Sequence, residues 1–220
     1  MFAALGVKIT IVDGRERLLD FCDPEIVDHL VFSARAMGIV FRLGENVESV
    51  EIVSDNKVIV ELESKKRIVG ETAFFSVGRE GDTESLQPAN AGLTTDKRGK
   101  LKCNEHFETE VPHIFAVGDV IGFPSLASTS MEQGRQAANY IYGKTHHQSE
   151  HVPYGLFTIP EIAMVGKTEE QLKDAGVEYR KGACPYGANG RAQAMGDVGG
   201  KIKVLADAKT DRILGVHAIG

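Results

Sequence analysis

The fold of this chain is decided by the stretch TEVPHIFAVGD, residues 109–119. Its apolar run Ile114–Val117 is typical of a short buried strand, and Gly118 and Asp119 follow at the carboxyl end of that strand. Ligands of open α/β sheets bind outside the carboxyl ends of the strands. A glycine there lets a ligand approach the backbone closely, and an aspartate beside it can bind a sugar-type hydroxyl. The stretch therefore predicts a ligand site at Gly118 and Asp119.

Downstream of this site the pattern predicts a helix and then a small α+β unit. The helix should begin around Ser125–Ala127 and end at Gly143, and a polar linker should follow at 144–150. A strand-like run is expected at Tyr154–Val165, interrupted by Pro160. The capping box Thr168–Gln171 should then begin a short helix that ends at Gly176. The last expected elements are strands at Glu178–Cys184, Lys201–Ala206 and Arg212–Ala218.

Upstream, the chain begins with what resembles the second half of a βαβ unit. Phe2–Leu5 is typical of a last helical turn capped by Gly6, and the β-branched run Val7–Val12 predicts a strand that ends at Asp13. In a dinucleotide-binding βαβ unit, an acid at this position accepts the ribose 2′-hydroxyl about 20 residues past a glycine-rich turn. Only twelve residues precede Asp13, so we expect the sequence to be the downstream part of a longer protein. A surface acid at the end of an ordinary strand is the alternative.

Two arginines close to Asp13 are relevant to whether the site binds NAD or NADP. Arg15 and Arg17 follow within four residues, and a guanidinium can pair with the 2′-phosphate of NADP, whereas an acid favours the free 2′-hydroxyl of NAD. An acid and two arginines on one loop would suit an enzyme that admits both nucleotides. The alternative is that both arginines are solvated surface charges.

The segment between these regions predicts an α/β portion with a hairpin insert. Asp23-Pro24 supplies an N-cap and a first-turn proline for a helix that Gly38 ends. The expected strands are Ile39–Arg42, Glu48–Val53, Val58–Glu63, a short one at Ile68-Val69, and a buried strand Ala73–Val77 that ends at Gly78-Arg79.

Composition narrows the function classes. The 220 residues are 42% hydrophobic and 25% charged, as in globular proteins, and a formal charge of −6 argues against nucleic acid or an anionic membrane as the main partner. No apolar run approaches a membrane span of roughly 20 residues, so we expect a cytoplasmic protein with no membrane partner. Cys22, Cys103 and Cys184 are far apart and predict neither a metal site nor a local redox disulfide.

Four segments together resemble one family. FFSVGR (74–79), HIFAVGDVIGFPSLAS (113–128), FTIPEIAMVGKTEEQL (157–172) and ILGVHAIG (213–220) are similar to the FAD-dependent pyridine-nucleotide oxidoreductases of the glutathione reductase and lipoamide dehydrogenase type. The resemblance implies an α/β fold in three incomplete parts. These are a Rossmann-type NAD(P)-binding domain at 1–81, an FAD-binding domain at 82–150, and an α+β dimerisation domain at 151–220.

The resemblance also implies roles for single residues. Asp119 should bond the ribityl chain of FAD, and the backbone N–H of Ala127 should face the pyrimidine edge of the flavin ring, where a helix N-terminus favours negative charge. Gly78 and Arg79 should lie where the nucleotide and flavin domains meet. The alternatives are a turn-forming role for Asp119 and a surface position for Arg79. No catalytic residue and no metal site is assigned.

Within the family, the expected function is FAD-dependent hydride transfer between NAD(H) and NADP(H). The run GDVIGFPSLASTSMEQGR is more similar to a transhydrogenase than to a disulfide reductase, and Gly81-Asp82-Thr83 replaces the family's usual proline-asparagine pair. A dihydrolipoyl dehydrogenase or related disulfide reductase is the first alternative, and a non-catalytic dimerisation module is the second. The chain is expected to form a homo-oligomer through residues 153–220, and to be inactive and bind FAD poorly by itself.

Overall fold

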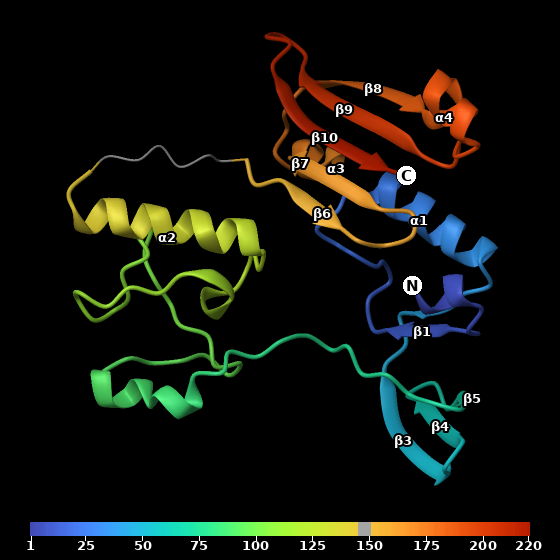
Figure 1. Cartoon of the computed structure of the whole chain (residues 1–220), viewed down its shortest axis with the longest axis horizontal. Helices are drawn as coiled ribbons and strands as arrows, with labels where there is room; N and C mark the ends of the chain where they lie inside the picture. The colour runs from blue at the N-terminus through green and yellow to red at the C-terminus, as the bar shows by residue number, and fades with distance from the viewer. Residues whose placement is uncertain (145–150) are drawn as a thin grey trace. The chain divides into compact units, whose positions relative to one another are not determined.

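The structure, a computed structural model, describes residues 1–144 and 151–220 (Figure 1). The chain divides into two compact units, one made of Met1–Phe74 with His151–Gly220 and the other of Phe75–Glu150. Most of the predicted polar linker, residues 145–150, lies outside the described residues.

The first unit opens with a parallel strand pair joined by a helix. A 3₁₀ turn, η1 (Phe2–Leu5), ends at Gly6 in the left-handed conformation, as predicted. Strand β1 (Thr10–Asp13) begins three residues later than expected and pairs in parallel with β2 (Val40–Leu43). Asp13 is therefore the last residue of a strand whose carboxyl end leads into a loop, as the sequence predicts.

Helix α1 (Pro24–Ala36) connects the two strands and has the predicted start. The Asp23 side chain accepts a hydrogen bond from the Glu25 amide at 3.2 Å, and Pro24 occupies the first helical position, where its missing N–H costs nothing. One face of the helix is buried through Ile26, Val27, Leu30 and Ala34.

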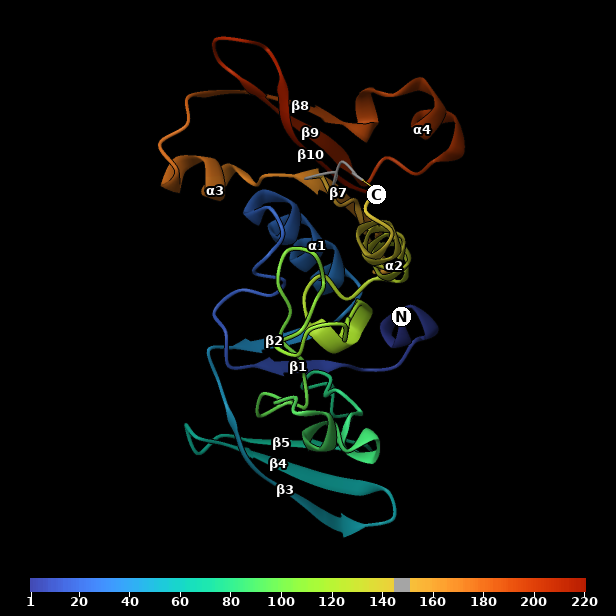
Figure 2. The same ribbon diagram turned by 90° about the vertical axis from the view of Figure 1, so that its left-hand side faces the viewer.

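A separate antiparallel sheet forms the predicted hairpin insert. Strands β3 (Val47–Ser54), β4 (Lys57–Leu62) and β5 (Arg67–Gly70) pair in that order, apart from the β1–β2 pair (Figure 2). Val58 and Leu62 of the central strand are buried.

Two predicted strands are wrong. Residues 73–77 form no strand, and Phe74 and Val77 are 81% and 86% exposed. Among the described residues no strand pairs with the backbone of 73–77. The run Ile114–Val117 makes only a single bridge, between Phe115 and Glu108, because it folds back on its own preceding loop rather than joining a sheet.

The second unit is mainly turns and short helices. Its 3₁₀ turns are η2 (Glu84–Leu86), η3 (Pro88–Ala91) and η4 (Gly118–Ile121). Helix α2 (Ala127–Ile141) follows and ends two residues before the predicted Gly143. The stretch 109–119 is therefore followed by the predicted helix, which begins at Ala127, although the stretch itself forms no strand.

The rest of the first unit is a five-stranded antiparallel sheet with short helices. The strand order is β6-β7-β10-β9-β8, and the expected run with its Pro160 interruption corresponds to the first two strands. The capping box is confirmed, with reciprocal bonds between Thr168 and Gln171. The elements are β6 (Tyr154–Leu156), β7 (Ile162–Gly166), α3 (Glu169–Asp174), β8 (Tyr179–Pro185), η5 (Tyr186–Ala188), α4 (Gly190–Met195), β9 (Lys201–Asp207) and β10 (Ile213–Ile219).

Helix α1 shares a core with this sheet. Ile26 and Leu30 pack with Ile162 of β7 and Ile219 of β10, and all four side chains are buried. Figure 1 shows α1 lying against the sheet on the side of β6 and β10. The helix that leads away from Asp13 is therefore held by residues more than 120 positions further along the chain.

Candidate functional site

Gly118 sits in a position that accepts no other residue without strain. Its φ is +80°, and a Cβ there would lie 3.1 Å from the hydroxyl oxygen of Ser130 on α2. Its N–H donates to Oε1 of Gln133, a buried side chain of the same helix, at 2.6 Å. The turn that carries Asp119 is thus fixed directly against helix α2.

Asp119 and Arg79, two of the predicted site residues, lie together. Nη1 of Arg79 is 2.9 Å from Oδ2 of Asp119, and the two side chains are 79% and 43% exposed. Exposed ion pairs contribute little stability, so a ligand hydroxyl can compete for the Asp119 carboxylate. The neighbouring Gly78 has φ +117°. The pairing itself was not foreseen, because forty residues separate the partners.

Ala127, the fifth residue predicted around the flavin, is the first residue of α2. The N-cap residue Leu126 has no side chain that can accept a hydrogen bond, so the first-turn amides have no side-chain cap. In the same turn Thr129 is buried, and its hydroxyl has no hydrogen-bond partner among the described residues. An orphaned buried hydroxyl beside uncapped amides fits a polar, electron-rich group such as the pyrimidine edge of a flavin.

Around the nucleotide candidate, the structure joins Asp13 to Arg15. Nε and Nη2 of Arg15 donate to the two carboxylate oxygens at 3.0 and 2.8 Å, and the Arg15 amide donates at 2.9 Å. These bonds, the side-chain ones above all, hold the pKa of Asp13 below its ordinary value, and the pKa of Arg15 is raised by the same contact. The acid and the nearer arginine therefore form a bidentate pair.

Arg17 points to a different partner. Its Nη2 lies 2.7 Å from Oε2 of Glu170 on α3, 153 residues away in sequence. The structure therefore brings Asp13 and Arg15 together but draws Arg17 away from them. Sequence reasoning missed Glu170 because no local pattern relates the two positions.

Sequence reasoning also missed a charged cluster, made of the buried Asp23 and Lys203 with the partly exposed Glu25 and Glu169. Nζ of Lys203 lies 2.8 Å from Asp23, 3.1 Å from Glu25 and 2.5 Å from Glu169. Lys203 and Asp23 are 1% and 0% exposed. Asp23 also accepts the Glu169 amide at 3.1 Å. The cluster therefore joins the start of α1 to β9 and α3.

Ionisation in this cluster follows from the pairing. Burial opposes the charge of Lys203, but hydrogen bonds to Asp23, Glu169 and Glu25 outweigh it, and the pKa of Lys203 is raised. The pKa of Glu25 falls from an ordinary 4.5 to about 2, chiefly through its bond to Lys201, against a smaller opposing effect of burial. The pKa of Glu169 is lowered mainly by Lys203. The shifts of Glu25, Glu169 and Lys203 all favour the charged forms, as a structural cluster requires.

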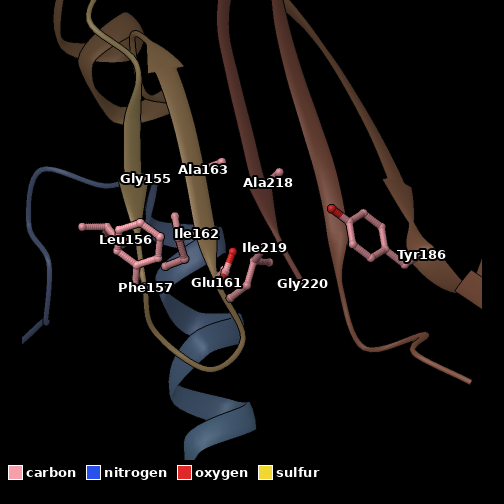
Figure 3. A pocket seen from close by; sticks show the side chains of 10 residues that line it. All are labelled: Gly155, Leu156, Phe157, Glu161, Ile162, Ala163, Tyr186, Ala218, Ile219 and Gly220. Carbon is pink, nitrogen blue, oxygen red and sulfur yellow. The ribbon is translucent and has the colours of Figure 1, made fainter. Parts of the chain in front are cut away.

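A pocket of about 140 Å³ lies at one end of the five-stranded sheet (Figure 3). Figure 3 shows Leu156, Phe157 and Ile162 on one side and Tyr186 across from them. Among the described residues that line it, Glu161 has the only acidic side chain, so the pocket offers no cluster of side chains for chemistry.

Other kinds of site find no support in the part of the chain that is described. Residues 1–144 and 151–220 hold no group of three or more potential metal ligands. Within the same ranges no helix is long and apolar enough to cross a membrane. All three cysteines are free, and burial raises the pKa of the Cys22 thiol to about 11, which makes it a poor nucleophile.

Comparison with known proteins identifies the family to which this chain belongs. Residues 1–134 match the model of the pyridine nucleotide-disulphide oxidoreductases, and residues 152–220 match the dimerisation domain of the same enzymes. The chain belongs to the pyridine nucleotide-disulphide oxidoreductase family, an α/β family. The resemblance and the fold class predicted from the sequence are thereby confirmed.

Among the relatives are proteins named soluble pyridine nucleotide transhydrogenase. The chain is 45% identical over its whole length to the one from Mycobacterium bovis (strain BCG / Pasteur 1173P2) and 43% identical to the one from Chromohalobacter salexigens. In both cases it covers 47% of the relative. The chain thus spans about half the length of the curated relatives that it matches.

Solved structures agree on the fold. The HOCl-induced flavoprotein disulfide reductase RclA from Escherichia coli superposes with a TM-score of 0.89 at 30% identity, over 98% of this chain and 50% of that one. LpdA from Mycobacterium tuberculosis gives a TM-score of 0.90 at 24% identity, over 100% of this chain and 48% of that one, which supports the fold alone.

Proposed function

We propose that this chain is part of a flavoenzyme that transfers hydride between NAD(H) and NADP(H). The observation that carries the proposal is the 45% identity, over the whole chain, to relatives named soluble pyridine nucleotide transhydrogenase. Because both nucleotides are intracellular metabolites, we expect the enzyme to work in the cytoplasm.

The Asp119 turn and the start of α2 would hold FAD. Asp119 would accept a hydrogen bond from a ribityl hydroxyl, while Arg79 orients its carboxylate. The uncapped amides at Ala127 would donate to the pyrimidine edge of the flavin, where negative charge gathers on reduction. When bound, FAD supplies the chemistry, since it can accept hydride from one nicotinamide and give it to the other.

The loop after β1 would bind the adenosine ribose of the nucleotide. Asp13 offers a carboxylate to the 2′-hydroxyl of NAD(H), and Arg15 and Arg17 offer guanidinium groups to the 2′-phosphate of NADP(H). Since Nε and Nη2 of Arg15 already donate to Asp13, a 2′-phosphate would either share this guanidinium with Asp13 or displace it. Charges of both signs on one loop would let the enzyme bind either nucleotide.

The predicted domain division belongs to the same proposal. Residues 1–81 would contribute to the NAD(P)-binding domain and 82–150 to the FAD-binding domain, while 151–220 would pair two subunits. The family match at 152–220 supports a homo-oligomer, since it is to a dimerisation domain. Light scattering on the full-length protein should therefore show a dimer, and a monomer at all concentrations would contradict it.

A disulfide reductase is the second candidate. It is favoured by the structural similarity to RclA, whose name describes a flavoprotein disulfide reductase. Such an enzyme needs a redox-active cysteine pair, and the three cysteines of this chain are free and distant from one another in sequence. The chain thus supplies no such pair itself.

Steady-state assays on the full-length protein separate the two candidates. The transhydrogenase proposal expects NADPH to reduce a thionicotinamide analogue of NAD⁺ with no disulfide present. A disulfide reductase would instead turn over only with lipoamide, glutathione disulfide or a similar acceptor. Absence of analogue reduction together with rapid disulfide reduction would refute the proposal.

A further inference from the structure

Arg17 is held by an acid from a distant part of the chain. Its Nη2 lies 2.7 Å from Oε2 of Glu170, and the side chains are 35% and 50% exposed. Its Nε is buried and has no hydrogen-bond partner among the described residues. The ion pair with Glu170 is therefore the contact that fixes the direction of the Arg17 side chain.

Glu170 is attached to a rigid support. It is the second residue of α3, whose first turn is fixed by the capping box between Thr168 and Gln171 and by the buried side chain of Leu172. The preceding Glu169 bonds to the buried Lys203 and to the Tyr179 hydroxyl. Arg17, in contrast, lies on the loop between β1 and α1, so in this pair the acid is fixed and the arginine adapts.

The two arginines of that loop are therefore engaged by different carboxylates. Arg15 pairs with Asp13 at the end of β1 and, at 3.5 Å, with Asp20 of the loop, whereas Arg17 pairs with Glu170 of α3. A 2′-phosphate that approaches the loop therefore meets two guanidinium groups that carboxylates already hold in place. A free 2′-hydroxyl carries no charge and does not depend on Arg17.

We propose that Glu170 is a specificity-determining residue, which restrains Arg17 from the 2′-phosphate and so keeps the affinities for NADP(H) and NAD(H) close together. This inference rests on the proposed function, because it assumes that the β1–α1 loop binds the adenosine ribose. Glu170 acts through Arg17 and is a positioning residue, not a catalytic one. We expect Glu170 to change the dissociation constant for NADP(H) only moderately, since ion pairs of this exposure shift a binding equilibrium by about two- to fivefold.

The test is the ratio of dissociation constants for NADPH and NADH, measured by calorimetry on the full-length protein. Glu170→Gln should tighten NADPH binding by about two- to fivefold and leave NADH binding unchanged. Asp174→Asn is the matched control, because it removes one negative charge from an exposed position one turn further along α3. The control should leave the ratio as it is in the unmodified protein.

A double-mutant cycle tests whether Glu170 acts on NADPH binding through Arg17. In an Arg17→Gln background, Glu170→Gln should no longer change NADPH binding, since the restrained cation is gone. The proposal is overturned if Glu170→Gln leaves the ratio unchanged, weakens NADPH binding, acts as Asp174→Asn does, or acts equally in the Arg17→Gln background.

The binding measurements test Glu170 independently of whether the protein transfers hydride. If the full-length protein binds both nucleotides but does not pass hydride between them, the proposed function fails while the ratio still tests Glu170. If transfer proceeds and the ratio does not respond to Glu170→Gln, this inference fails alone.

Discussion

Lys203 on β9 and Asp23 at the start of α1 form a buried ion pair across 180 positions of sequence, with Nζ 2.8 Å from Oδ1. The Asp23 carboxylate thus makes three interactions: it pairs with Lys203, it caps α1, and it accepts a hydrogen bond from the Glu169 amide of α3. The pair therefore joins the helix that leaves the Asp13 loop to the five-stranded sheet. The ion pair therefore fixes the end of the proposed nucleotide-binding loop that leads into α1.

Replacing Lys203 should strongly destabilise the folded chain. Lys203→Met leaves the buried Asp23 carboxylate without its counter-charge, and we expect a loss of about 3–5 kcal/mol in the free energy of unfolding. Urea denaturation of the chain measures it. Lys209→Met is the control, because Lys209 and its partner Glu178 are 79% and 74% exposed and should matter little. Equal effects of the two variants would contradict the structural role of the cluster.

Acid should loosen the same cluster over a defined range of pH. Because the pKa of Glu25 is about 2 in the folded chain against an ordinary 4.5, its contribution is complete above about pH 4.5 and is lost as the pH falls toward about 2. The lowered pKa of Glu169 acts in the same direction. Glu25→Gln should make the free energy of unfolding less dependent on pH in this window, and an unchanged slope would speak against the pairing.

Substitutions in the β1–α1 loop should separate the two nucleotides. In the full-length enzyme, Arg15→Ala with Arg17→Ala should raise the KM for NADP(H) far more than for NAD(H), because both candidate phosphate partners are gone. Asp13→Ala should do the reverse, and it leaves Arg15 with only its longer contact to Asp20 at 3.5 Å. Steady-state kinetics with each nucleotide checks this. Parallel changes in the two KM values would mean that the loop does not recognise the 2′ position.

Loss of the Asp119 carboxylate should weaken FAD binding without unfolding the protein. The hydrogen bond proposed to a ribityl hydroxyl has a charged acceptor and is worth roughly 1.5–3 kcal/mol, or about ten- to a hundredfold in the dissociation constant. Fluorescence titration of the full-length Asp119→Ala apoprotein with FAD measures the change. Asp82→Ala, an exposed acid of the same unit, is the control. Identical affinities for both variants would remove Asp119 from the site.

The sequence predicted those elements whose signals are local. The start of α1 at Asp23-Pro24 and the capping box at Thr168 depend on residues within one helical turn, and both form as expected. The strand expected at 73–77 depends instead on neighbouring strands. An apolar run has the same composition whether or not a partner strand lies beside it, so the pattern could not show that Phe74 is exposed.

The candidate site divides in the same way. The motif at Gly118-Asp119 and the charges at Asp13 and Arg15 are adjacent in sequence and could be selected from it. The partner of Arg17 could not, since it is 153 residues away and only the packing of α3 near the loop brings Glu170 within reach. The same holds for Lys203, since no local pattern relates it to the three carboxylates that surround it.

The most direct measurement is an anaerobic spectrum of the flavin in the full-length protein through one complete transfer. NADPH is added first to reduce the bound FAD, and an excess of NAD⁺ follows with no disulfide present. We predict that the absorbance of oxidised flavin disappears with NADPH and returns with NAD⁺, while NADH forms. A flavin that NADPH reduces but that only a disulfide reoxidises would contradict hydride transfer between the two nucleotides.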